Sequence, residues 1–137
     1  MKKTRILAII LFIAIIMTSA MALYSCADKN TLGKGATSFK LEITDKDGKT
    51  ETYTIKTDEK TVGDALKHTD VKLLTADASA SGFDTVNGMK ADYTADGAYW
   101  EFFIDGVSAT DSAFNTDVVK DAKYAFKYTI YNPDAIG

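Results

Sequence analysis

Few side chains in this sequence could take part in covalent or proton-transfer chemistry. Cys26 is the only cysteine and His68 the only histidine of the 137 residues. A thiol can act as a nucleophile, a metal ligand or a point of modification, and an imidazole can move protons near neutral pH. His68 belongs to no Gly-x-Ser-x-Gly, His-Glu-x-x-His or glycine-rich phosphate motif. We therefore expect a protein that is not an enzyme, with His68 as a solvated residue at a helix C-terminus.

The stretch before Cys26 has the three zones of a secretory signal peptide. Three basic residues near the N-terminus precede the unbroken apolar run ILAIILFIAIIM at residues 6–17, and mostly small residues follow as far as Ser25. The apolar run is shorter than the about 20 residues that a membrane-spanning helix needs. We expect cleavage, with a retained transmembrane anchor as the alternative.

Residues 23–26, Leu-Tyr-Ser-Cys, resemble the lipobox of bacterial lipoproteins, which has a branched apolar residue three positions before the cysteine and a small residue directly before it. The resemblance implies that residues 1–25 are a lipoprotein signal peptide and that Cys26 carries a diacylglyceryl group. Two acyl chains are enough for stable anchoring. The protein is thus expected at the extracytoplasmic face of the cell membrane, held there by the lipid. The alternative is an ordinary signal cleaved after Ala22, which leaves a free thiol.

The part after residue 25 is an acidic segment that is long enough for one compact domain. It holds all 19 acidic residues but only 13 of the 16 basic ones, so its formal charge is −6. An acidic domain without a lysine cluster is a poor partner for nucleic acid. Residues 26–37 are expected to be the lipidated cysteine and a flexible tether, because ADKNTLGKGAT at 27–37 is small, polar and glycine-rich. The folded domain then covers residues 38–137.

Alternating apolar residues predict a strand-rich domain. Strands are expected at 38–44, 51–56, 98–104 and 124–131, and the Asp-Gly turn at 45–49 joins the first two into a hairpin. One short helix begins at Thr61, whose hydroxyl can cap it, and presents an apolar face of Val62, Ala65 and Leu66. Gly63 weakens this helix by about 1 kcal/mol relative to alanine, so the helix must dock on the sheet. The fold class is α+β.

The acidic turns match only part of a metal-binding loop. Asp45 and Asp47 are spaced like the first ligands of a calcium-binding loop, but the later ligands of such a loop are missing from the sequence. The turn with Asp92 and Asp96 also lacks these later ligands. A hairpin turn that uses Asp and Gly for their backbone preferences is the simpler interpretation. We expect no metal site.

The aromatic strand AYWEFFI at 98–104 supplies the candidate ligand-binding residues. Its side chains alternate, so Tyr99 and Phe103 point to one face while Trp100 and Phe102 point to the other. One of these faces must be core, and the sequence leaves open which. An exposed aromatic patch on a small domain marks an interaction site, and Tyr131 extends it if it lies nearby.

Four segments resemble, in order, the bacterial domain grouped with the C-terminal domain of transcobalamin and intrinsic factor: TVGDAL, SGFDTVNGM, AYWEFFIDGVSA and FKYTIY. The resemblance covers roughly residues 39–131. It implies a β-grasp-like fold for the domain 38–137, and it makes cobalamin a candidate ligand. The large helical barrel that completes the site in the vertebrate carriers has no room here, so at most half of that site is expected.

Two functions from different classes remain. The first is a membrane-tethered domain that binds a small molecule, such as a corrinoid, and passes it to a transporter. The second is a protein-interaction or adhesion module of the cell envelope, which docks a partner through the same surface or an exposed strand edge.

Overall fold

The computed structural model describes residues 30–135. Contacts divide the chain into residues 1–31 and 32–137, and the second unit is the folded domain. The expected signal peptide and Cys26 lie outside the described residues, so cleavage and lipidation stay predictions. Within the described residues, no helix has the length and apolar character needed to cross a membrane.

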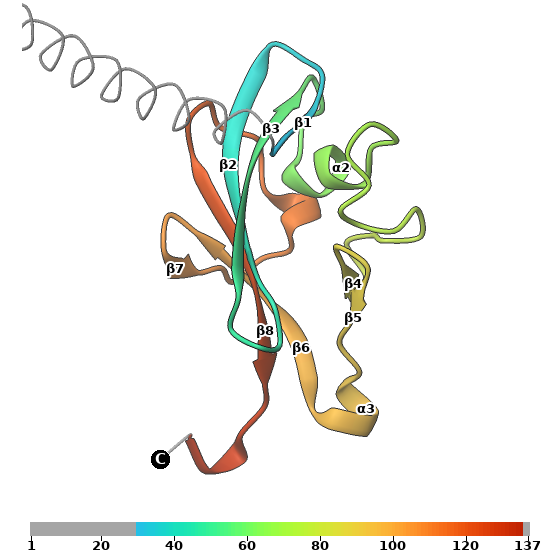
Figure 1. The fold of residues 1–137 in the computed structure, drawn as a ribbon, viewed down its shortest axis with the longest axis vertical. Coiled ribbons are helices and arrows are strands. Elements are labelled where there is room, and N and C mark those ends of the chain that lie inside the picture. Colours follow the sequence, from blue (N-terminus) through green and yellow to red (C-terminus); the bar gives the residue numbers. More distant parts are fainter. Residues whose placement is uncertain (1–29, 136–137) are drawn as a thin grey trace, which may run out of the picture. The chain divides into compact units, whose positions relative to one another are not determined.

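A six-stranded mixed sheet forms the body of the domain (Figure 1). The strand order is β1-β3-β2-β8-β6-β7, with β2 and β8 parallel at its centre and antiparallel pairs between β2 and β3, β8 and β6, and β6 and β7. With few helices, this mostly β domain is consistent with the expected α+β class. The six strands are β1 (Thr31–Gly33), β2 (Thr37–Thr44), β3 (Thr50–Thr57), β6 (Ala98–Ile104), β7 (Val107–Ser108) and β8 (Lys123–Ile130).

The expected tether is wrong over its second half. Residues 31–33 form strand β1, which pairs with β3, and the Ala36 amide donates to the Asp58 carboxylate at 2.9 Å. A Cβ atom on Gly33 would collide with the Lys56 carbonyl oxygen. Glycine, which suggested flexibility in the sequence, is needed here because the chain passes very close to the β3 backbone.

The β2–β3 hairpin confirms the predicted turn. The strands pair from Thr37 opposite Thr57 to Thr44 opposite Thr50. In the turn, the Asp45 carboxylate accepts hydrogen bonds from the amides of Asp47 and Lys49, at 2.9 and 3.0 Å. Asp45 therefore stabilises the turn backbone, as Asp commonly does. The described residues contain no group of three or more His, Cys, Asp and Glu side chains that could hold a metal ion.

Helix α2 (Val62–Lys67) follows β3 and covers one face of the sheet. The Thr61 hydroxyl oxygen accepts from the Asp64 amide at 3.2 Å, so the predicted cap is confirmed, and Val62, Ala65 and Leu66 are buried. His68 ends the helix with an exposed imidazole, as expected. The phenyl ring of Phe114, in the short helix η1 (Ala113–Asn115), packs directly against Gly63.

The turn-rich middle of the chain lies on the same side of the sheet as α2 (Figure 1). It contains the hairpin of β4 (Thr85–Val86) and β5 (Met89–Lys90), with Asn87 and Gly88 at its turn. The short helix α3 (Tyr93–Asp96) then leads into β6, and the single-turn helix η2 (Pro133–Ala135) follows β8. The segment between α2 and α3, together with α2 itself, covers the core face of the sheet.

The buried face of β6 is the face of Trp100 and Phe102. These side chains are 9% and 8% exposed, and the Phe102 ring stacks on Tyr124 and Phe126, with centroid distances of 6.0 and 5.1 Å. Tyr99 and Phe103 point to the opposite face, where the polar residues of the neighbouring strands lie. The structure thus decides the question that alternation alone left open.

Candidate functional site

An open hollow lies where β6 begins, between this strand, α3 and the β5 segment. Its volume is about 290 Å³, near the lower end of the roughly 300–1,000 Å³ typical of small-molecule sites. We call it the aromatic hollow, because four of its lining residues are aromatic. It is lined by Phe83, Asp84, Lys90, Ala91, Asp92, Tyr93, Thr94, Ala98, Tyr99 and Trp100.

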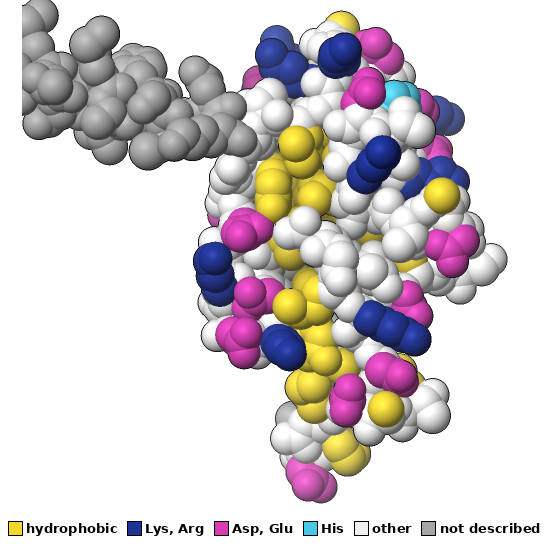
Figure 2. Space-filling model, turned by 45° about the vertical axis from the view of Figure 1, so that its right-hand side comes forward, with side chains coloured by type: hydrophobic (Ala, Val, Ile, Leu, Met, Phe, Trp, Pro, Cys, Tyr) yellow, Lys and Arg dark blue, Asp and Glu magenta, His cyan; other side chains and the backbone are white. Residues whose placement is uncertain are grey.

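Exposed tyrosines surround this end of the sheet. Tyr93 is 60% exposed, Tyr99 37% and Tyr131 45%, and Ile130 beside them is also exposed. The rings of Tyr93 and Tyr131 lie 6.2 Å apart at a tilt of 49°. Figure 2 shows hydrophobic side chains reaching the surface down to this end of the domain. Such a grouping of large apolar residues on a small domain is typical of a binding surface.

Helix α3 holds Tyr93 in place through its two ends. The Asp92 carboxylate caps the helix by accepting from the Ala95 amide at 3.0 Å, and Gly97 ends it in the left-handed conformation with φ of 66°. The Tyr131 amide donates to the Gly97 carbonyl at 2.8 Å. The start of β6 and the end of β8 therefore hold Tyr93 and Tyr131 at the same end of the sheet.

The charges around the hollow are mainly negative. Burial raises the pKa of Tyr99, and the nearby Glu101 carboxylate and Tyr93 phenol raise it further. Lys90, the one cationic residue that lines the hollow, forms an ion pair with Asp84, with Nζ and Oδ2 3.8 Å apart. The Asp92 carboxylate has no such cationic partner among the lining residues.

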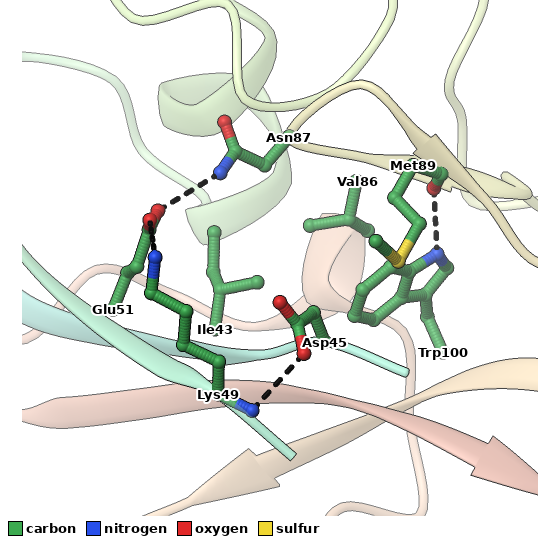
Figure 3. A pocket seen from close by; sticks show the side chains of 8 residues that line it. All are labelled: Ile43, Asp45, Lys49, Glu51, Val86, Asn87, Met89 and Trp100. Carbon is green, nitrogen blue, oxygen red and sulfur yellow. Dashed lines mark hydrogen bonds and ion pairs between the residues drawn. The ribbon is translucent and has the colours of Figure 1, made fainter. Parts of the chain in front are cut away.

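A second, smaller pocket lies between the β2–β3 turn and the β4–β5 hairpin (Figure 3). Its volume is about 80 Å³, too small for a drug-sized ligand. The Asn87 amide donates to Glu51 at 3.3 Å, and the Trp100 indole donates to the Met89 carbonyl at 3.2 Å. These bonds attach the β4–β5 hairpin to the sheet and orient Trp100, so we interpret this pocket as structural.

Tyr53 completes the contacts at the small pocket. Its hydroxyl donates to Glu51 at 2.6 Å and accepts from the Asn87 amide at 3.2 Å. Burial raises the pKa of Tyr53, and the Glu51 carboxylate adds to this shift. The phenol therefore stays protonated and keeps its donor at ordinary pH.

The structure separates the four predicted ligand-binding residues. Tyr99 and Trp100 line the aromatic hollow, as does Phe83. Phe102 is buried in the core, and Phe103 lies further along β6 on the face that it shares with Tyr99, so neither lines the hollow. The hollow lies at the start of β6, so the position of a residue along the strand, and not its face, decides whether it lines the hollow.

Sequence reasoning did not single out Tyr93, the most exposed ring of the site. The signal was present in DYTADG at residues 92–97, which has a capping Asp before the tyrosine and a glycine at the helix end. The helix is only four residues long, too short for an apolar period to reveal it.

Comparison with known proteins supports the fold. No family model and no curated protein matches the sequence. Among solved structures, a provisionally assigned metal-binding protein from Ruminococcus gnavus ATCC 29149 is similar with a TM-score of 0.61 and 18% identity, over 71% of this chain and 100% of that chain. Haptocorrin in complex with Cbi is similar with a TM-score of 0.53 and 14% identity, over 70% of this chain.

These likenesses concern the fold alone. The chain corresponds to only 25% of the haptocorrin chain. Because haptocorrin belongs to the transcobalamin family, the shared fold agrees in part with the resemblance that the four sequence segments indicated.

Proposed function

We propose that this protein is a non-enzymatic, lipid-anchored domain at the extracytoplasmic face of the membrane, which binds a small molecule in the aromatic hollow. The observation that carries the proposal is an open hollow of about 290 Å³, lined by Phe83, Tyr93, Tyr99 and Trp100. Flat apolar molecules bind to aromatic rings by stacking and edge contacts. A membrane transporter is the partner that we propose for delivery of the bound molecule.

A corrinoid is the ligand that we propose to test first. Haptocorrin, which shares the fold, is in complex with Cbi. We further propose that the sheet is of the β-grasp type. In the chain, the β2–β3 hairpin is followed by helix α2, and the later strand β8 pairs in parallel with β2. The domain corresponds to a quarter of haptocorrin, so the hollow supplies one wall of such a site and weak binding is expected.

Cobalamin should change the emission of Trp100, the single tryptophan, and raise the melting temperature of the full-length protein in non-ionic detergent. Replacing Tyr99 by leucine should weaken binding about two- to thirteenfold, the range that a lost aromatic contact of about 0.5–1.5 kcal/mol produces. The matched control is Phe103→Leu, which removes a ring from the same face of β6 but outside the hollow and should leave binding unchanged. Unchanged emission and melting at high cobalamin would exclude this ligand.

Lipid anchoring has its own test. In bacterial cells, Cys26→Ser should move the protein from the membrane fraction to the soluble fraction, because the hydroxyl cannot receive the diacylglyceryl group. Ser25→Ala keeps a small residue before the cysteine and should stay in the membrane. Retention of Cys26→Ser in the membrane fraction would argue for an uncleaved apolar anchor.

A protein-interaction or adhesion module is the second candidate. The exposed side chains of Ile130 and Tyr131 favour it, since neither residue lines the hollow. Binding of a purified envelope protein that is lost in Tyr131→Ser but insensitive to cobalamin would support this function over small-molecule binding.

A further inference from the structure

The chemistry of the aromatic hollow combines rings with uncompensated negative charge. Tyr93 and Tyr99 contribute exposed rings, and Asp92 contributes a carboxylate. This carboxylate also caps α3 by accepting a hydrogen bond from the Ala95 amide. The lysine at this site is occupied by its ion pair with Asp84. A ligand in the hollow therefore meets aromatic faces and a net negative field.

This combination attracts one class of ligand. The face of an aromatic ring is the negative part of its quadrupole and attracts cations within about 6 Å of the ring centroid. Tyrosine rings grouped around an ammonium group are a known way to recognise alkylammonium compounds. An anionic ligand would be repelled by Asp92 and by Glu101, whose charge already acts on the Tyr99 phenol.

We infer that the aromatic hollow selects a ligand that carries a positively charged alkylammonium group, which lies over the rings of Tyr93 and Tyr99 with Asp92 as its counter-charge. This inference rests on the proposed function of the hollow as a small-molecule site and names a class of ligand different from the corrinoid that is tested first. The Asp92 carboxylate and the rings are partly open to water, which makes this a modest, salt-sensitive preference.

The test compares choline with 3,3-dimethylbutan-1-ol, an uncharged molecule of nearly the same shape. Both are titrated into the full-length protein in non-ionic detergent, with Trp100 emission and the melting temperature as readouts. Choline should bind about tenfold tighter than the alcohol at low salt, the order of a cation–π contact. Equal affinity for the two molecules would overturn the inference.

Three variants locate the effect. Asp92→Asn keeps a good N-cap and removes the charge, so it should reduce the preference for choline severalfold. Tyr93→Phe keeps the ring and should bind choline almost normally, whereas Tyr93→Leu should not. The control Asp70→Asn removes an equal charge beside His68, outside the hollow, and should behave as the wild type.

The outcomes separate this inference from the function on which it rests. Cobalamin binding with no preference for choline over the alcohol would leave the small-molecule function standing and refute the charge preference. Absence of binding by cobalamin, choline and the alcohol would refute both. A preference that survives in Asp92→Asn and Tyr93→Leu would place the cation elsewhere and refute the assignment to the hollow.

Discussion

Phe102→Ala is expected to lower the free energy of unfolding by about 3–5 kcal/mol, whereas Phe103→Ala, one residue further along β6, costs about 1 kcal/mol or less. Phe102 is 8% exposed and stacks on Tyr124 and Phe126. Removing its ring leaves a cavity that the rest of the core cannot fill. Phe103 is only partly buried on the open face of the sheet, so truncation there leaves no enclosed cavity.

The measurement is urea unfolding of the two variants and the wild type, followed by circular dichroism. The two phenylalanines have the same side chain on the same strand, so each variant is the control for the other. Similar losses in both variants would mean that the second face of the sheet is also covered, for example by a partner. A larger loss in Phe103→Ala would mean that the buried face of β6 has been assigned wrongly.

Gly63→Ala should destabilise the protein, although the change favours a helix. In an isolated helix, alanine is about 1 kcal/mol better than glycine. Here the new Cβ atom would lie 2.5 Å from ring carbons of Phe114. Inserting a methyl group into such a packed contact typically costs about 1–3 kcal/mol, so we expect a net loss of the order of 1 kcal/mol or more in the free energy of unfolding.

A double-mutant cycle isolates the cause of this loss. In a Phe114→Ala background the ring is gone, and Gly63→Ala should then be neutral or stabilising by up to about 1 kcal/mol. Chemical denaturation of the four proteins gives the coupling between the two sites. An equal penalty in both backgrounds would show that the ring of Phe114 is not what requires glycine at this position.

Local patterns predicted most of the regular structure. The alternation of Phe39, Leu41 and Ile43 placed β2, the Asp-Gly turn placed the hairpin, and Thr61 placed the start of α2. Each of these signals depends only on residues that are a few positions apart in the sequence. The sequence does not predict strand β1, because Gly33 and Gly35 suggest a flexible segment. In the structure these glycines are needed for close contact with the backbone of Lys56 and Thr57, which are distant in sequence.

The candidate site was predictable only in part. Tyr99 and Trp100 were identified from the aromatic strand and do line the hollow. Phe102 and Phe103 belong to the same aromatic strand, but Phe102 is core, Phe103 lies further along the open face, and neither lines the hollow. Tyr93 and Phe83 reach the hollow from the loop-rich middle, and that approach depends on long-range packing.

The sequence by itself determined the properties that depend on residue type and short spacing: one acidic, strand-rich domain, a capped helix, and a cysteine in a lipobox-like segment. Only the tertiary structure decided which side of β6 is buried, why residue 63 must be glycine, and which rings meet at the hollow. The physical reason is that burial on either face of a strand satisfies the same alternation. The choice is made by α2, η1 and the middle segment, which pack against one face and leave the other open.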